Sequence, residues 1–286
     1  MTAVERVGVV GCGLMGAGFA EVTGLAGLDV IVLATGEQSA ARGRQRLADS
    51  LDRAVRRGRT TVADRDIALR HITFTSDIKD LSDRQFVLEA VPERVHEKRA
   101  LFAELDTVVQ DPDAILASNT SSIPIMKIAG ATRDPGRVIG AHFFNPVPAM
   151  PLVELVSSLR THPTTLERTR AFVTDTLGKQ TVHGADQPGF TVNALLVPYL
   201  LSAVRMLGSG SASAEEIDRG MTLGCGHPMG PLALIDLIGL DTIASVADAM
   251  YEELKEPLYA PPPRLLRMIE AGRLGRKTRQ GFHTYS

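Results

Sequence analysis

Residues 8–18 read GVVGCGLMGAG, and this stretch decides how the first half of the chain is interpreted. It follows an apolar run, opens a helix-forming segment, and has the spacing Gly-x-Gly-x-x-Gly. In such a loop the three glycines permit a tight turn, close approach of a pyrophosphate, and close packing of helix on strand. The helix N-terminus then offers amide N–H groups to the anion. A purely structural turn is the alternative. The cofactor-binding residues expected here are Gly11, Gly13, Leu14, Met15 and Gly16.

The second strand of such a domain normally ends in an acidic residue that bonds the adenosine 2′-hydroxyl of NAD. Here the corresponding position is Ala34, followed by Thr35. One interpretation is that the site accepts the 2′-phosphate of NADP, with Thr35 and Arg42 as ligands. The other is that the nearby arginines form a solvated helix face and NAD binds with less discrimination. We therefore expect NAD or NADP as the cofactor, and the missing acid at Ala34 suggests NADP.

Outside the glycine loop, the first part of the chain alternates short apolar runs with amphipathic stretches. The runs are β-branched and apolar almost throughout, as expected for parallel strands covered on both faces. The alternation predicts an α/β fold, a Rossmann-type doubly wound sheet with right-handed crossovers. The strands are expected at residues 6–10, 30–33, 86–89, 114–117, 138–142 and 152–156.

Helical periodicity occupies the intervals between these strands. The long helix over 39–57, together with a helical piece at 64–70, is expected to form a helical arm that leaves the sheet. The helices are expected at residues 14–26, 39–57, 93–109, 123–129 and 164–177.

The pattern of apolar residues changes after Gln187-Pro188-Gly189. Beyond this point helical periodicity continues and strand-like apolar runs become rare. We expect an all-helical C-terminal domain. The predicted organisation is an NAD(P)-binding Rossmann domain at 1–187 and a helical substrate and dimerisation domain at 188–286. Helices in this second domain are expected at residues 194–207, 214–222, 231–254 and 263–270.

Composition excludes several other classes of protein. The 286 residues carry a net charge of −2, so no strong field attracts nucleic acid or an anionic membrane. The longest apolar stretch, 194–207, contains Pro198 and Arg205 and is too short to span a bilayer. Two separate cysteines form neither a disulfide framework nor a metal-ligand motif, and the polar N-terminus does not read as a signal peptide. We expect a cytoplasmic protein with no metal site, no membrane partner and no nucleic-acid partner.

Polar residues gather where predicted strands end, the place at which open α/β sheets bind ligands. They are SNTSS at 118–122, HFFNP at 142–146, and Glu154 inside the run at 152–156. A glutamate within an apolar strand is costly unless paired, and His142 is the obvious partner. A histidine oriented by a carboxylate can take the proton of an alcohol that loses hydride. The alternative is a buried structural pair.

Several segments together resemble one known family, the 3-hydroxyacyl-CoA dehydrogenases, and within it the short-chain bacterial 3-hydroxybutyryl-CoA dehydrogenases. The resemblance covers essentially the whole chain, with the motifs in the family's order. The segments are GCGLMGAG, SNTSSIPI, HFFNPVPAMPLVELV, DQPGFTVNALLVPYL and GHPMGPLALIDLIGLD.

The resemblance implies a role for each matching residue. His142 matches the catalytic base, Glu154 the carboxylate that orients it, and Ser121 the serine that bonds the substrate oxygen. Asn193 matches the asparagine that contacts substrate from the helical domain. The remaining matches line the cofactor and catalytic pocket, and a structural hydrogen-bonding role is the alternative for Asn145 and Glu93. These residues are Glu93, Lys98, Asn119 and Asn145.

Basic residues on the helical arm hold the CoA phosphates in this family. Here the arm reads SLDRAVRRGR, so Arg53, Arg56 and Arg57 are the corresponding candidates. The alternative is an ordinary solvated helix end whose charges complement the helix dipole. The resemblance also implies an acyl-CoA substrate and a homodimer formed through the helical domain.

Two other functions remain open from the sequence. One is a dehydrogenase acting on a hydroxyacyl group bound to a carrier protein, whose phosphopantetheine the arm arginines would meet. The other is a dinucleotide-binding relative without turnover, which the intact set of Ser121, His142, Glu154 and Asn193 argues against. Acyl chain length and physiological direction cannot be read from these residues.

Overall fold

Short apolar segments form one eight-stranded sheet. The computed structural model describes residues 3–286. The strands are β1 Arg6–Val10, β2 Asp29–Leu33, β3 Ile72–Thr75, β4 Phe86–Glu89, β5 Ile115–Ser118, β6 Val138–Phe143, β7 Leu152–Val156 and β8 Gln180–Gly184. Their order is β3-β2-β1-β4-β5-β6-β7-β8, and every neighbouring pair is parallel except β6 with β7. The first six strands in this list thus have the Rossmann order, which confirms the predicted fold class.

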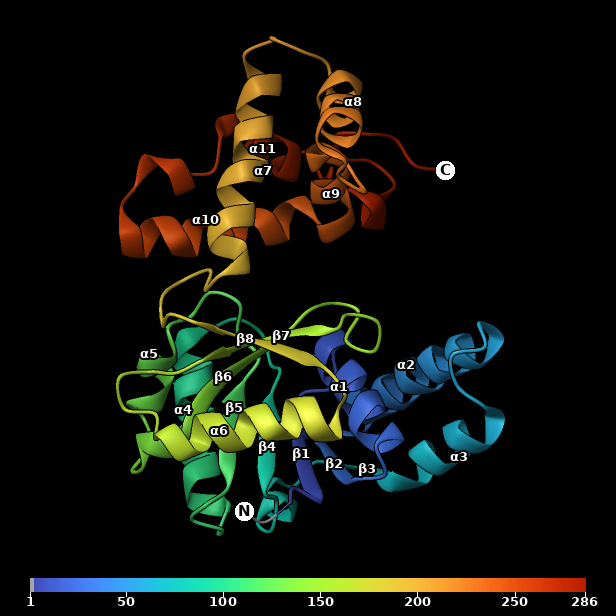
Figure 1. Cartoon of the computed structure of the whole chain (residues 1–286), viewed down its shortest axis with the longest axis vertical. Coiled ribbons are helices and arrows are strands. Elements are labelled where there is room, and N and C mark those ends of the chain that lie inside the picture. Colours follow the sequence, from blue (N-terminus) through green and yellow to red (C-terminus); the bar gives the residue numbers. More distant parts are fainter. Residues whose placement is uncertain (1–2) are drawn as a thin grey trace. The chain divides into compact units, whose positions relative to one another are not determined.

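Helices cover both faces of the sheet, as strands buried on both sides require. Figure 1 shows α6 crossing one face, and α2 with α3 extending to one side as the predicted arm. On the opposite face, the α5 residue Ile125 packs against Gly140 of β6, where an added Cβ would lie 2.8 Å from Ile125 Cδ1. The helices are α1 Leu14–Leu25, α2 Glu37–Arg56, α3 Val62–His71, α4 Val95–Val108, α5 Ile125–Ala129 and α6 Pro163–Ala171.

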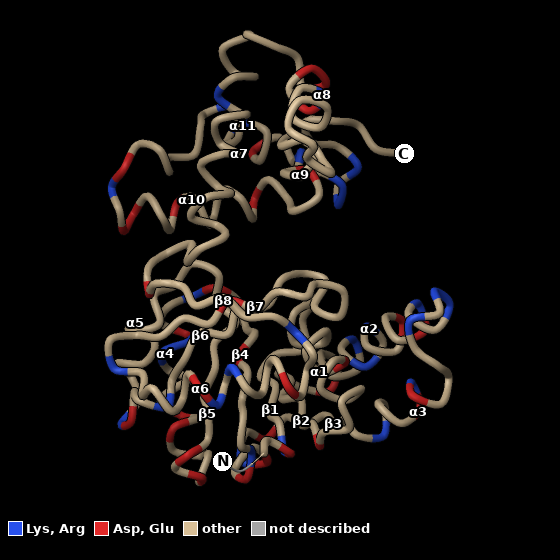
Figure 2. Tube along the Cα trace, viewed as in Figure 1, with Lys and Arg blue, Asp and Glu red and all other residues tan. Residues whose placement is uncertain are grey.

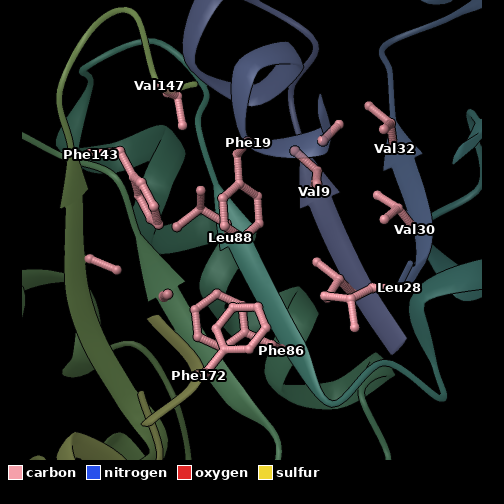
Figure 3. Packing of buried hydrophobic residues seen from close by; sticks show 14 of the residues in the cluster. Val9, Phe19, Leu28, Val30, Val32, Phe86, Leu88, Phe143, Val147 and Phe172 are labelled. Carbon is pink, nitrogen blue, oxygen red and sulfur yellow. The ribbon is translucent and has the colours of Figure 1, made fainter. Parts of the chain in front are cut away.

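An aromatic group forms the centre of the core between the sheet and α1 (Figure 3). The ring centroid of Phe19 lies 6.0 Å from that of Phe86 and 5.1 Å from that of Phe143, and Phe86 lies 4.6 Å from Phe172. Such pairs add about 0.5–1.5 kcal/mol each beyond the area they bury. Because Phe143 follows His142 in β6, this packing also fixes the strand end that carries the histidine.

Two strands were not predicted, and both lack a continuous apolar run. β3 reads ITFT and β8 reads QTVHG, an edge strand with three exposed residues. Pairing with a neighbouring strand determines their conformation more than their own burial does. The helix expected at 164–177 is also shorter than predicted, because α6 ends at Ala171 and a π-helical turn follows over Phe172–Thr176.

The chain divides into two compact units, Met1–Gln187 and Pro188–Ser286. The second contains only helices as regular elements and has its own apolar core. A single helix over 231–254 is wrong, because Gly239 has φ of +108°, which ends one helix and caps the next. No helix within residues 3–286 is long and apolar enough to cross a membrane. The helices are α7 Val192–Gly208, α8 Ala214–Cys225, α9 Pro231–Ile238, α10 Leu240–Leu254 and α11 Pro263–Glu270.

Candidate active site

The glycine loop joins β1 to α1 and has the geometry that a dinucleotide requires. Gly11 has φ of +99°, and a Cβ on it would lie 2.8 Å from the carbonyl oxygen of Ala90. A Cβ on Gly16 would lie 1.9 Å from the carbonyl oxygen of Gly11, so helix and loop are in contact there. Gly13 differs, because a Cβ on it would meet no atom of residues 3–286 within 4 Å.

The space beside Gly13 is therefore available to a ligand. Gly13 is also the N-cap of α1, so no side chain at that position accepts a hydrogen bond from the N–H groups of the first turn. The first turn contains no acidic residue. Leu14 is 65% exposed in that turn, and Met15 is half-buried. Unsatisfied amides and a positive helix end suit a pyrophosphate. These residues fit a bound dinucleotide.

His142 and Glu154 come together as the sequence predicts. They are directly opposed in the antiparallel register of β6 and β7, and Nδ1 of the histidine lies 2.7 Å from Oε2 of the glutamate. The Glu154 side chain is fully buried and that of His142 is 9% exposed. A carboxylate only accepts hydrogen bonds, so it selects the tautomer with the proton on Nδ1. The neutral ring then has its basic nitrogen at Nε2.

Glu93 holds the loop that carries Ser121. Its Oε1 accepts hydrogen bonds from the backbone N–H groups of Ser121, at 3.0 Å, and Ser122, at 3.2 Å, and another from the Thr120 hydroxyl. Its Oε2 lies 3.2 Å from Nζ of Lys98. Burial alone would raise the pKa of Glu93, but the Lys98 ammonium and these hydrogen bonds hold that pKa below its ordinary value. Glu93 is therefore an anion that fixes the serine loop.

A second, fully buried carboxylate supports Lys98 from the other side. Glu89, the last residue of β4, accepts a hydrogen bond from Lys98 Nζ at 2.6 Å and one from the Val91 N–H at 2.7 Å. Its other oxygen accepts from the Ser118 hydroxyl at 2.6 Å. The sequence did not single out Glu89, and it indicated Ser118 only as the first residue of the polar segment SNTSS. Glu89 is a glutamate at the end of the apolar run FVLE, and an acidic residue in an apolar strand is the pattern that pointed to Glu154.

Asn119 joins the serine loop to the strand that carries His142. Its Oδ1 accepts a hydrogen bond from the Phe143 N–H at 2.9 Å, one residue beyond the histidine. This bond links the carboxyl ends of the parallel strands β5 and β6, so the serine loop and His142 lie at the same edge of the sheet.

Asn145 lies in the loop between β6 and β7, and its peptide bond to Pro146 is cis. The loop is held by Lys179, which is 8% exposed and donates from Nζ to the carbonyl oxygens of Val147 and Met150, each at 2.8 Å. Burial lowers the pKa of Lys179. Sequence reasoning did not single out this lysine, because nothing in its neighbourhood along the chain shows which loop it reaches.

The remaining candidates lie elsewhere in the fold. Arg53 and Arg56 are in the last turn of α2 and Arg57 is its C-cap, and all three are exposed. Figure 2 shows the basic residues at this end of the arm, away from the sheet. Asn193 is half-buried in the first turn of α7, in the second unit. Ala34 is buried at the end of β2, whereas Thr35 and Arg42 are exposed.

Comparisons with known proteins match both units of the chain to one family. Residues 6–187 match the model of the 3-hydroxyacyl-CoA dehydrogenase NAD binding domain, and residues 189–285 match the C-terminal domain of the same family. A 3-hydroxybutyryl-CoA dehydrogenase of Mycobacterium tuberculosis is 58% identical over 283 residues, covering 99% of each chain. A mitochondrial hydroxyacyl-coenzyme A dehydrogenase of Sus scrofa is 39% identical over 289 residues, 99% of this chain and 91% of the relative. The (S)-3-hydroxybutyryl-CoA dehydrogenase of Ralstonia eutropha has a crystal structure with a TM-score of 0.93 and 42% identity, covering 99% of this chain and 100% of the other.

Proposed function

We propose that this chain, which belongs to the 3-hydroxyacyl-CoA dehydrogenase family, interconverts (3S)-3-hydroxyacyl-CoA and 3-oxoacyl-CoA, with 3-hydroxybutyryl-CoA as its substrate. The observation that carries the proposal is the buried His142–Glu154 pair at 2.7 Å, on strands of the same unit as the open glycine loop. A base with a fixed tautomer beside a dinucleotide site is what alcohol oxidation by hydride transfer requires.

The protein's own groups would handle the proton. In the oxidative direction Nε2 of His142 takes the proton of the 3-hydroxyl, and the carboxylate of Glu154 stabilises the imidazolium that forms. In the reductive direction the same nitrogen returns the proton to the 3-oxo oxygen. A bound NAD or NADP supplies the nicotinamide that exchanges hydride with substrate C3. The chemistry thus divides between a protein acid–base pair and a cofactor held at Gly11, Gly13 and Gly16.

The other candidate residues would position substrate. The hydroxyl of Ser121, on a loop held by Glu93, would donate to the reacting oxygen, and the Asn193 amide would do the same from the helical domain. Arg53, Arg56 and Arg57 supply positive charge for the CoA phosphates. We assign substrate binding and dimer formation to residues 188–286.

The test is an assay with acetoacetyl-CoA that follows the loss of reduced nicotinamide absorbance, with NADH and NADPH in parallel. His142→Gln is expected to lower kcat at least 100-fold, within the usual contribution of a general acid–base, and to keep nucleotide binding. His183→Gln is the matched control, since His183 is exposed in β8. No turnover of acetoacetyl-CoA by folded, nucleotide-binding protein would reject the proposal, and turnover of an acetoacetyl carrier protein instead would identify the thioester.

A further inference from the structure

The adenosine end of the cofactor site lacks the usual acid, and its nearest substitute is already paired. Ala34 is buried where β2 ends, and the next acidic residue is Glu37, at the first position of α2. Glu37 is ion-paired with Arg44 from the same helix, and the two side chains are 81% and 46% exposed. A pair so exposed is worth little by itself, and a stronger ligand can replace either partner.

The Phe74 ring holds the Arg44 side chain in position. The Arg44 guanidinium carbon lies 5.4 Å from the ring centroid of Phe74, a residue of β3 that pairs with Val32 of β2. The helix approaches closely there because Gly43 has no side chain: an added Cβ would lie 2.9 Å from Phe74 Cε1 and 2.7 Å from Cys12 Cβ. The guanidinium thus lies over an aromatic ring of the strand that neighbours β2.

The other two arginines of this helix segment have different surroundings. Arg46 donates from Nη1 to the carbonyl oxygen of Cys12 at 2.8 Å, so it supports the glycine loop. Arg42 is exposed, and its side chain makes no hydrogen bond or ion pair within residues 3–286. Of the three arginines, only Arg44 combines a fixed position with an anion that can be exchanged.

We infer that Arg44 selects the cofactor by binding the 2′-phosphate of NADP, in competition with Glu37. The inference rests on the proposed function. A phosphate with close to two negative charges offers Arg44 a stronger bidentate partner than a single carboxylate does. With NAD, no phosphate is present and Arg44 stays with Glu37. The chain therefore accepts both cofactors and prefers NADP.

Binding of adenosine fragments tests this without any turnover. Isothermal titration calorimetry with 2′,5′-ADP and 5′-AMP isolates the contribution of the 2′-phosphate. The parent protein is expected to bind 2′,5′-ADP about tenfold more tightly than 5′-AMP, the scale of a charge-assisted contact at an exposed site. Arg44→Gln is expected to remove this difference and to leave 5′-AMP binding unchanged.

Two further variants complete the design. Glu37→Gln is expected to increase the affinity for 2′,5′-ADP at least threefold, because the competing carboxylate is gone. Arg42→Gln tests the other arginine that the sequence suggested as a phosphate ligand. It is expected to change either affinity less than threefold, because an exposed charge acts only through a screened field, and a tenfold loss of 2′,5′-ADP affinity in this variant would overturn the inference. Two other results would also overturn it: equal or weaker binding of 2′,5′-ADP by the parent, or loss of 5′-AMP binding in Glu37→Gln. The second would assign Glu37 to the ribose hydroxyls.

A steady-state measurement links the binding result to the enzyme. The ratio of kcat/KM for NADPH to that for NADH is expected to fall about tenfold in Arg44→Gln, through KM for NADPH alone. An unchanged ratio counts against the inference. If the parent turns over neither cofactor, the proposed function fails, whereas the titrations still decide the role of Arg44.

Discussion

His142 and Glu154 face each other across the only antiparallel pair of neighbouring strands in the described sheet, with 2.7 Å between Nδ1 and Oε2. Twelve positions separate them along the chain, so one hairpin supplies both groups. The arrangement sets the carboxyl group of Glu154 against the ring that the proposed reaction protonates.

Glu154→Gln keeps a hydrogen-bond acceptor opposite Nδ1 but removes the charge. We expect kcat for acetoacetyl-CoA reduction to fall about 100-fold, with little change in KM for the nicotinamide cofactor. Steady-state kinetics measure both quantities. Glu167→Gln, at an exposed position of α6, is the control for the loss of one carboxylate. A Glu154→Gln enzyme with parental kcat would show that the pair is only structural.

Lys98→Met is expected to destabilise the protein by about 3–5 kcal/mol, because it leaves a buried carboxylate without its counter-charge. The Glu89 side chain is 0% exposed and lies 2.6 Å from Nζ of Lys98. Urea unfolding measures the effect, and Lys79→Met, at an exposed position, serves as control. Adding Glu89→Gln to Lys98→Met is expected to restore part of the loss. Equal unfolding midpoints for Lys98→Met and Lys79→Met would contradict the burial argument.

Glu21→Gln is expected to become more stabilising as pH rises. Burial raises the pKa of Glu21 above its ordinary value of 4.5, against smaller opposing effects of Ser50 and Arg53, and Oε2 has no hydrogen-bond partner among residues 3–286. A group with a raised pKa contributes stability that is complete below the unfolded pKa and is lost as pH rises through the folded pKa. Glutamine mimics the protonated form and does not suffer that loss.

Urea unfolding of Glu21→Gln and the parent from pH 4 to pH 8 checks this sign. The two proteins are expected to be close at the acidic end, and the variant more stable at the alkaline end. Glu104→Gln, exposed on α4, controls for the change in net charge. A difference that shrinks with rising pH would mean that Glu21 is held as a paired anion.

Two glycines of the cofactor loop are expected to respond differently to alanine. At Gly13 the added Cβ meets no atom of residues 3–286 within 4 Å, so Gly13→Ala should fold with an unchanged Tm and lose at least tenfold in nucleotide affinity. At Gly16 the Cβ would lie 1.9 Å from the Gly11 carbonyl oxygen, so Gly16→Ala should lower Tm as well. Thermal unfolding and NADH fluorescence separate the two effects. Equal Tm losses in both variants would deny that Gly13 faces an open space.

The sequence predicted the fold class because strand and helix signals alternate with unambiguous periods up to Gln187. It missed β3 and β8, whose residues carry little burial of their own, and it joined α9 to α10 because periodicity does not reveal that Gly239 takes a positive φ. The local pattern of apolar and polar residues indicates which residues are buried. It does not indicate which neighbouring strand will complete a weakly apolar one.

In the candidate site, too, contacts within one hairpin were predictable and contacts between distant elements were not. His142 and Glu154 were paired correctly because a buried charge demands a partner and the nearest was one hairpin away. Glu89 sends the same signal, yet its partners Ser118 and Lys98 come from β5 and α4, and only the strand order brings them together. Contacts of this kind depend on the order of the strands in the sheet, so they cannot be predicted from the local pattern of the sequence.

The anchored loop between β6 and β7 bears on how cooperatively the His142–Glu154 hairpin opens. Lys179 ties that loop by two carbonyl oxygens to the start of β8, so the hairpin bearing His142 and Glu154 is anchored at its tip. Because both residues are on this one hairpin, we expect a local opening of it to displace the proposed base and its carboxylate together. The proposed acid–base pair is then expected to be gained or lost as a unit rather than one residue at a time.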